Sequence, residues 1–260
     1  IDAGGVTRPS ARRARLQRLL EVIRADVRKA YRRIGGLTAR ELQELLEVEA
    51  QATATILRDA GRAVEFTLGA SLPTPATYAA LAEDTLVQGA PLSSWWEAQS
   101  ARTFDAFAQQ VRLGVAAGET VDDLVRRIVG GKRAGQVVPG VMEVSRRHAR
   151  TLVLTSVASA QNAAREAVYE ANLDVIEGFA HLSRLDSRTS DICIARADKR
   201  WDAATKKPIG HSLPYQVPPL HPRCRSVLIP LDIGGRPPAQ TGADEWINGL
   251  SRAEQDDLLG

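Results

Sequence analysis

The chain is poor in cysteine, methionine and aromatic residues, and it has no long apolar run. Its 260 residues include two cysteines, one methionine and 5% aromatic residues. Two cysteines exclude a disulfide-dense scaffold and fit assembly in a reducing cytoplasm. No apolar run reaches the roughly 18 residues of a membrane-spanning helix, so we expect no membrane partner. The remaining composition, 44% hydrophobic and 25% charged, is typical of a globular protein.

Common catalytic motifs are also missing. The sequence has no HExxH motif, no nucleophile elbow and no paired-carboxylate motif. The glycine-rich segment Gly130–Gly140 lacks the Lys-Ser/Thr pair that ends a P-loop, and it follows an expected helix rather than a strand. We therefore interpret this segment as a loop, and we expect the protein not to be an enzyme.

Charge is unevenly distributed, although the net charge is only +3. The segment Arg12–Arg33 has nine basic and two acidic residues, whereas Asp232–Gly260 has two basic and six acidic residues. The basic segment is either a surface for phosphates or an acidic partner, or an ordinary solvated helix face. The candidate contact residues are Arg12, Arg13, Arg15, Arg24, Arg28 and Arg32.

Apolar spacing predicts two long helices in the first part of the chain. The first runs from Ser10 to about Arg33, and Gly35-Gly36 is predicted to end it. Thr38 and Glu41 fit a capping box for a second helix that reaches about Phe66. The pattern therefore predicts a helical hairpin.

Further helices are expected over about 75–87, 93–117, 120–128 and 141–172. We assign Trp95 and Trp96 to the core, because aromatic residues at helical spacing are more often buried than used as a stacking platform. The expected fold class is mainly α, with long helical hairpins in the N-terminal part and a small α+β module near the C-terminal end. We divide the chain into a helical region 1–140, the module region 141–230 and an acidic tail 231–260.

Both cysteines lie in the module, between an expected strand over Val175–Leu182 and a second expected strand that ends at Pro230. Cys193 starts a short helix, and His221 and Cys224 form an H-x-x-C turn that Pro222 stiffens. Together with His211 they would make a tetrahedral set for a structural zinc ion. The alternatives are two buried cysteines beside a histidine that hydrogen-bonds backbone, or a disulfide. The segment Pro208–Pro222, here called the Pro-rich loop, must return the second strand beside the first. We therefore expect Cys193, His221 and Cys224 to lie within a few ångströms of one another, whether or not a metal is bound.

A turn just after the first expected strand contains Asp186, Arg188 and Thr189. A carboxylate beside an arginine can form a bidentate pair that fixes a turn. The threonine hydroxyl can cap the helix that holds Cys193. We therefore predict a structural turn made by these three residues.

The segments LDSRTSDIC and HPRCRSVLIP together resemble the signature of the Mu F-like minor head protein, or phage head morphogenesis, family of tailed bacteriophages. The preceding HARTLVLTSVASAQNAAR and the tail ADEWINGLSRAEQDDLLG are similar to segments of members of that family. The resemblance covers about Val141–Gly260. Ser190 and Ser226 stand where the family pattern has cysteines, so Cys193, His221 and Cys224 would be the remaining ligands of any metal site.

This resemblance implies a structural minor head protein inside the capsid near the portal. Such a protein would act in head morphogenesis and in DNA packaging or ejection, and would be in the host cytoplasm during assembly. The implied partners are the portal protein, the major capsid or scaffold protein, and packaged DNA.

Two other functions remain open. A metal-dependent hydrolase or nuclease would use Cys193, His221 and Cys224, with Asp186 or Asp191 as the carboxylate beside the metal. A plain DNA-binding protein would need more basic residues in the module than the sequence has, because affinity for phosphates grows with the number of contacts.

Overall fold

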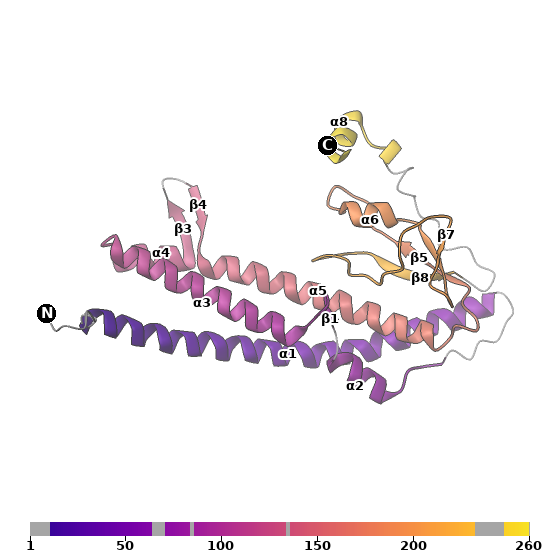
Figure 1. Ribbon diagram of the computed structural model, residues 1–260, viewed down its shortest axis with the longest axis horizontal. Coiled ribbons are helices and arrows are strands. Elements are labelled where there is room, and N and C mark those ends of the chain that lie inside the picture. The colour runs from indigo at the N-terminus through magenta and orange to yellow at the C-terminus, as the bar shows by residue number, and fades with distance from the viewer. Residues whose placement is uncertain (1–10, 64–70, 84–85, 134–135, 232–246, 260) are drawn as a thin grey trace, which may run out of the picture. The chain divides into compact units, whose positions relative to one another are not determined.

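The computed structural model describes residues 11–63, 71–83, 86–133, 136–231 and 247–259 (Figure 1). The chain forms two compact units, which alternate along the sequence. The first unit comprises Ile1–Thr38 and Leu92–Leu152, and the second comprises Ala39–Pro91 and Val153–Gly260. The predicted regions 1–140, 141–230 and 231–260 do not coincide with these compact units, and the predicted division into regions stays a prediction.

Helix α1 runs without interruption from Ala11 to Ala63 (Figure 1). The predicted turn at Gly35-Gly36 is therefore wrong. A glycine inside a helix costs only about 1 kcal/mol relative to alanine, which a long helix tolerates. Gly35 also leaves room for an aromatic ring, because a Cβ there would lie 3.0 Å from Trp96 Cδ1. Thr38 does not cap a second helix; its hydroxyl donates to the Ile34 carbonyl at 2.9 Å.

The first unit contains three further helical segments and a β-hairpin. The sequence predicts a helix over about 120–128, and α4 begins there with a capping box formed by Thr120 and Asp123. The segment interpreted as a loop, Gly130–Gly140, instead contains two antiparallel strands. The elements are α3 (Leu92–Ala116), α4 (Val121–Val129), β3 (Gly130–Arg133), β4 (Gln136–Pro139) and the beginning of α5 (Val141–Glu170).

Apolar side chains of α1 and α3 form the core of the first unit. Leu20, Phe104 and Ala108 are buried together, and further apolar residues of both helices pack around them. Trp96 is also buried and lies beside Tyr31, with ring centroids 6.1 Å apart. The prediction that the tryptophan pair serves the core is confirmed for Trp96.

The second unit combines the later parts of α1 and α5 with short elements and a four-stranded sheet. The short elements are α2 (Pro75–Glu83), the antiparallel pair β1 (Leu86–Val87) and β2 (Ala90–Pro91), α6 (Asp191–Arg196) and α8 (Arg252–Leu259). Part of the predicted acidic tail, residues 232–246, lies outside the described residues.

The sheet of the second unit is entirely antiparallel, in the order β7-β6-β5-β8. Its strands are β5 (Gly178–Leu182), β6 (Arg200–Asp202), β7 (Pro208–Ile209) and β8 (Val227–Leu231). The sequence predicts β5 and β8 but not the two short strands between them. The predicted fold class, mainly helical with a small sheet near the C-terminal end, is confirmed.

The core beside this sheet is aromatic. Phe179 and Trp201 are fully buried, and Tyr169 and Tyr215 lie against the Phe179 ring. The indole of Trp201 donates to the Leu213 carbonyl at 2.9 Å, which ties the Pro-rich loop to β6. Among the helices that the structure describes, none is long and apolar enough to cross a membrane.

Candidate functional site

Three of the four residues predicted as metal ligands meet in the second unit. Cys193 Sγ lies 3.2 Å from His221 Nε2 and 3.6 Å from Cys224 Sγ. The ligand atoms of all three residues lie within 4.8 Å of one another. Both cysteines are buried and free, and the sulfur separation is well beyond a disulfide bond of about 2.05 Å. The predicted proximity is confirmed, and the disulfide alternative is not.

Two local structures bring these residues together. Cys193 lies in the first turn of α6, where its side chain is buried. His221 and Cys224 share one tight turn, in which the Cys224 N–H donates to the His221 carbonyl at 3.1 Å. Arg223, inside that turn, has a φ of 61° and donates its N–H to Thr155 Oγ1 on α5. The turn is thus attached to a helix of the same unit.

The His221 ring is oriented by its own turn. Its Nδ1 lies 2.9 Å from the Pro222 carbonyl oxygen, which can only accept a hydrogen bond. The proton of the neutral ring is therefore on Nδ1, and the lone pair on Nε2 faces the Cys193 sulfur. A backbone carbonyl that fixes the tautomer in this way is typical of metal-binding histidines.

His211, the fourth predicted ligand, is not part of this group. Its Nε2 donates to the Arg200 carbonyl at 2.8 Å, and its Nδ1 accepts from the Leu213 N–H at 3.1 Å. The ring also stands edge-on to Trp201, with centroids 4.9 Å apart. Both ring nitrogens are thus used by backbone groups, so the prediction of His211 as a ligand is wrong on geometry.

The two thiols interact strongly with each other. The hydrogen bond from the Cys193 thiol lowers the pKa of Cys224, and the same contact together with burial raises the pKa of Cys193. Backbone N–H groups near Cys224 also favour its thiolate. The two thiols together therefore lose one proton readily. The resulting thiolate attracts a cation, and a metal ion bound there would displace the remaining thiol proton.

A row of small polar groups lies beside the sulfur atoms. Ser183 Oγ donates to the Cys193 carbonyl at 2.9 Å and lies 3.1 Å from both Ser226 Oγ and His181 Nδ1. Ser190 is the N-cap residue of α6 but makes no capping hydrogen bond, and its Oγ is buried beside the Cys193 sulfur. This corner of the module is thus polar although it is buried.

The predicted structural turn forms, but with a different arginine. The two carboxylate oxygens of Asp186 accept from Nη1 and Nη2 of Arg225, each at 2.6 Å, whereas the Arg188 guanidinium is 3.8 Å away. Arg188 donates its backbone N–H to Asp186 Oδ1 at 2.9 Å, and its exposed guanidinium makes only a longer ion pair. Thr189 accepts from the Asp186 N–H and donates to the Arg184 carbonyl, so it does not cap α6. Sequence reasoning missed Arg225, which lies 39 residues from its partner.

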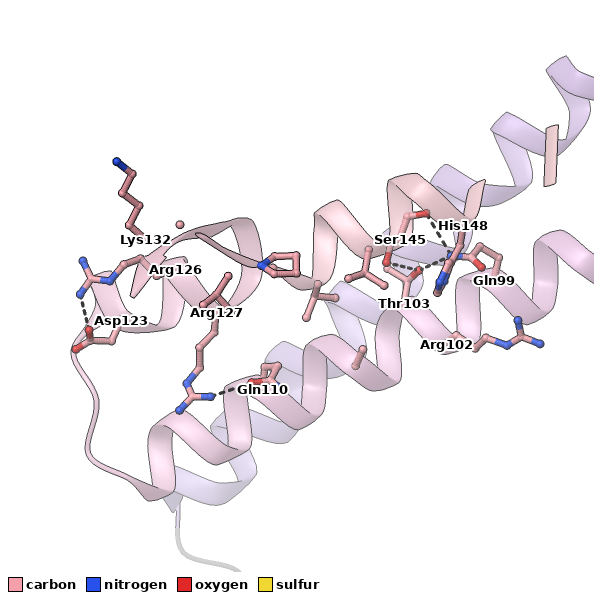
Figure 2. Close-up of a pocket in the computed structure, with 17 residues that line it drawn as sticks. Gln99, Arg102, Thr103, Gln110, Asp123, Arg126, Arg127, Lys132, Ser145 and His148 are labelled. Carbon is pink, nitrogen blue, oxygen red and sulfur yellow. Dashed lines mark hydrogen bonds and ion pairs between the residues drawn. The ribbon is translucent and has the colours of Figure 1, made fainter. Parts of the chain in front are cut away.

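A second candidate site is a groove of about 700 Å³ in the first unit (Figure 2). It lies between α3, α4, the β3–β4 hairpin and the start of α5. Its polar wall is a buried hydrogen-bonded set, in which Thr103 Oγ1 donates to Ser145 Oγ at 3.0 Å and Gln99 donates to the Ser145 carbonyl. Figure 2 shows Lys132 and Arg102 at opposite ends of this groove.

The charges that line the groove are mostly positive. Arg127 is neutralised by Glu119, and Arg126 by Asp123. Arg102, Lys132 and His148 are exposed and have no ion pair among the described residues. The sequence pattern does not reveal this groove, because its walls come together only when the β3–β4 hairpin forms.

The arginines predicted in the first helix are placed only in part. Arg24, Arg28 and Arg32 are exposed on α1, and the Arg24 guanidinium lies 4.4 Å from the centre of the Phe104 ring. Arg12, Arg13 and Arg15 lie in the first turns of α1, with side chains outside what the structure describes.

Comparison with known proteins identifies one family. Residues 105–229 match the family model described as phage Mu protein F like protein. The match begins within α3 and ends within β8, so it contains both candidate sites except for the first residues of the groove. No curated protein and no solved structure matches the chain. The chain therefore carries a phage Mu protein F-like domain, which belongs to a family of phage head morphogenesis and minor head proteins.

Proposed function

We propose that this protein is a structural minor head protein that acts inside the capsid, near the portal, during head assembly and DNA packaging or ejection. The observation that carries the proposal is the phage Mu protein F-like domain over residues 105–229. The long helices α1, α3 and α5 offer extended surfaces to the portal and to the major capsid or scaffold protein.

The same geometry argues against the hydrolase or nuclease alternative. A metal-dependent hydrolase needs a reachable metal position and a carboxylate or another base beside it. Cys193 and Cys224 are buried, and among the described residues no carboxylate joins them and His221 at ligand spacing. Asp186 is held by Arg225 through both of its oxygens. We therefore propose a protein without enzymatic activity.

Isolation of heads that lack DNA tests the proposed role. The protein should remain with the portal after mild dissociation of the shell, and it should crosslink to the portal. Purified protein should not cleave DNA or peptide substrates in the presence of Mg²⁺, Mn²⁺ or Zn²⁺. Turnover that His221→Ala abolishes, together with no association with any head protein, would replace the structural role with a catalytic one.

The groove favours direct contact with DNA as a second role. Phosphate groups are the natural occupants of a groove with unpaired cations at its ends, since ion pairing with phosphates is a main source of affinity for nucleic acids. Arg102 and Lys132 supply two such cations, and Gln99 and Ser145 add polar groups to the lining. The basic face of α1 is the other candidate surface in the first unit.

Salt dependence distinguishes the two surfaces. Each phosphate contact that is lost should reduce the slope of log K against log salt by about 1. We expect the pair Arg102→Glu and Lys132→Glu to flatten this slope for duplex DNA. Replacement of Arg24, Arg28 and Arg32 by glutamate measures how much the basic face of α1 contributes to the same slope. Arg188→Glu is the control, because this exposed arginine lies outside both surfaces. Equal slopes for all four proteins would exclude phosphate contact by either surface.

A further inference from the structure

We propose that Cys193, His221 and Cys224 bind a structural Zn²⁺ ion through three protein ligands, and that the buried Ser190 hydroxyl, or a water molecule enclosed beside it, fills the fourth position. Two thiolates and one imidazole form a soft ligand set that favours zinc over magnesium or calcium. The inference does not rest on the proposed head role.

The distances already fit a common metal ion. Zinc–sulfur bonds of roughly 2.3 Å in a tetrahedral site place two thiolates about 3.8 Å apart. The two sulfur atoms are 3.6 Å apart, and Cys193 Sγ is 3.2 Å from His221 Nε2. A small movement of His221 would lengthen the distance from its Nε2 to the Cys193 sulfur to the value expected for two ligands of one zinc ion.

The histidine is held in the form that a metal requires. Its Nδ1 proton is used by the Pro222 carbonyl, so Nε2 presents a lone pair to the two sulfurs. The turn that holds it is attached to α5 through Thr155, and it also carries Cys224. Two of the three ligands therefore keep their separation when the rest of the loop moves.

Ser190 identifies the fourth position. It precedes Cys193 by three residues, one helical turn, so both side chains lie on the same side of α6. Its hydroxyl is buried beside the Cys193 sulfur, and among the described residues no nitrogen or oxygen atom forms a hydrogen bond with it. A buried hydroxyl without a partner costs free energy, and coordination to a cation or to its water would supply the missing interaction.

The ion would connect two segments that are far apart in the sequence. Cys193 and Cys224 are separated by 31 residues, and the segment between them includes β6, β7 and the Pro-rich loop. An ion held from both ends of this segment would stabilise the sheet, because binding to the native site adds directly to the free energy of folding.

Metal uptake by the full chain provides the first test. Protein stripped with chelator under reducing conditions should bind one Zn²⁺ per chain, measured by native mass spectrometry, and should then melt at a higher temperature. Cys224→Ser should weaken Zn²⁺ binding by more than roughly a hundredfold, since loss of even an outer-shell partner costs up to that factor. His211→Gln is the control and should bind like the wild type. Absence of uptake by the wild type, or uptake that Cys224→Ser leaves unchanged, would overturn the site.

A gain of affinity tests the fourth position without the risk of unfolding. Ser190→Cys should supply a third thiolate and tighten Zn²⁺ binding by roughly tenfold or more. With Co²⁺ as the probe, its thiolate charge-transfer absorption should exceed that of the wild type. Ser187→Cys adds a cysteine at an exposed position of the same loop and should change neither quantity. Ser190→Cys with wild-type affinity and absorption would contradict a fourth position beside Ser190.

Discussion

Asp186 and Arg225 form a two-bond ion pair across 39 residues of sequence, with both nitrogen–oxygen distances at 2.6 Å. Asp186 follows β5, and Arg225 lies between Cys224 and β8. The pair therefore joins the neighbouring strands β5 and β8 at the end of the sheet where the sulfur atoms lie. The bidentate hydrogen bonds from Arg225 hold the pKa of Asp186 well below its usual range.

Replacement of this arginine should lower the melting temperature of the protein. Arg225→Lys keeps the charge but loses the planar fork that reaches both carboxylate oxygens. Arg188→Lys is the matched control, because the Arg188 guanidinium is 3.8 Å from the carboxylate and its backbone bond survives the change. Calorimetry should show a clear decrease for the first variant and little for the second. Equal melting temperatures would mean that solvent screening cancels the pair.

The ion pair between Asp186 and Arg225 also makes the melting temperature depend on pH in the acid range. A carboxyl group whose pKa is lowered on folding stabilises the native state above its unfolded pKa of 3.8 and loses that contribution as the pH falls further. The difference in melting temperature between wild type and Arg225→Lys should therefore shrink below about pH 4.

Two glycines should respond oppositely to alanine. Gly36 lies within α1, and a Cβ there would meet nothing within 4 Å, so Gly36→Ala should stabilise the protein by up to about 1 kcal/mol. Gly140 is buried, and its Cβ would lie 2.1 Å from the Gly130 nitrogen. Gly140→Ala should therefore destabilise the first unit by about 1–3 kcal/mol. Urea unfolding measures both changes, and a destabilising Gly36→Ala would indicate a break in α1 in solution.

These glycines also show what the sequence could predict of the fold. Helical spacing correctly indicated α3 and α5, whose apolar residues are largely buried. It also indicated α4, although no residue of that short helix is buried, because Thr120 and Asp123 mark its start. It failed at Gly35-Gly36, where a local stop signal worth about 1 kcal/mol per residue is outweighed by the continuous helix. The space that Gly35 leaves for Trp96 depends on a residue 61 positions away, so no local pattern reveals it.

The candidate site was predictable where its ligands are close in sequence. His221 and Cys224 share one turn, and the return of the chain to the sheet brings Cys193 to them. His211 was misassigned because the spacing does not show that Arg200 and Leu213 use both of its nitrogens. The partner of Asp186 and the groove of the first unit depend on tertiary contacts, which the sequence pattern does not contain.

The buried hydroxyl of Thr103 should contribute measurably to the stability of the first unit. It donates to Ser145 Oγ and lies 3.0 Å from Tyr31 Oη, so it connects α3 with both α5 and α1. Thr103→Val preserves the shape but leaves these partners unsatisfied, at a cost of about 1–3 kcal/mol. Thr55→Val is the control, because that exposed hydroxyl bonds to its own helix. Similar urea midpoints for the two variants would contradict this role.

His181 should make the stability of the second unit depend on pH. Its ring is fully buried, and burial, with the charge of Arg196, lowers its pKa from 6.5 to about 4. Ser183 accepts from Nδ1, while Nε2 has no partner among the described residues, so a second ring proton would be buried without an acceptor.

The direction of the pH effect follows from the lowered pKa. Between pH 6.5 and 4 the unfolded chain binds a proton that the native ring does not, so the contribution of His181 is complete above pH 6.5 and decreases as the pH falls. The total loss should be about 3 kcal/mol, measured by urea unfolding with metal chelated. His181→Leu should flatten this profile, whereas His148→Leu, at an exposed position, should not. A profile equally steep in His181→Leu would assign the proton uptake to another group.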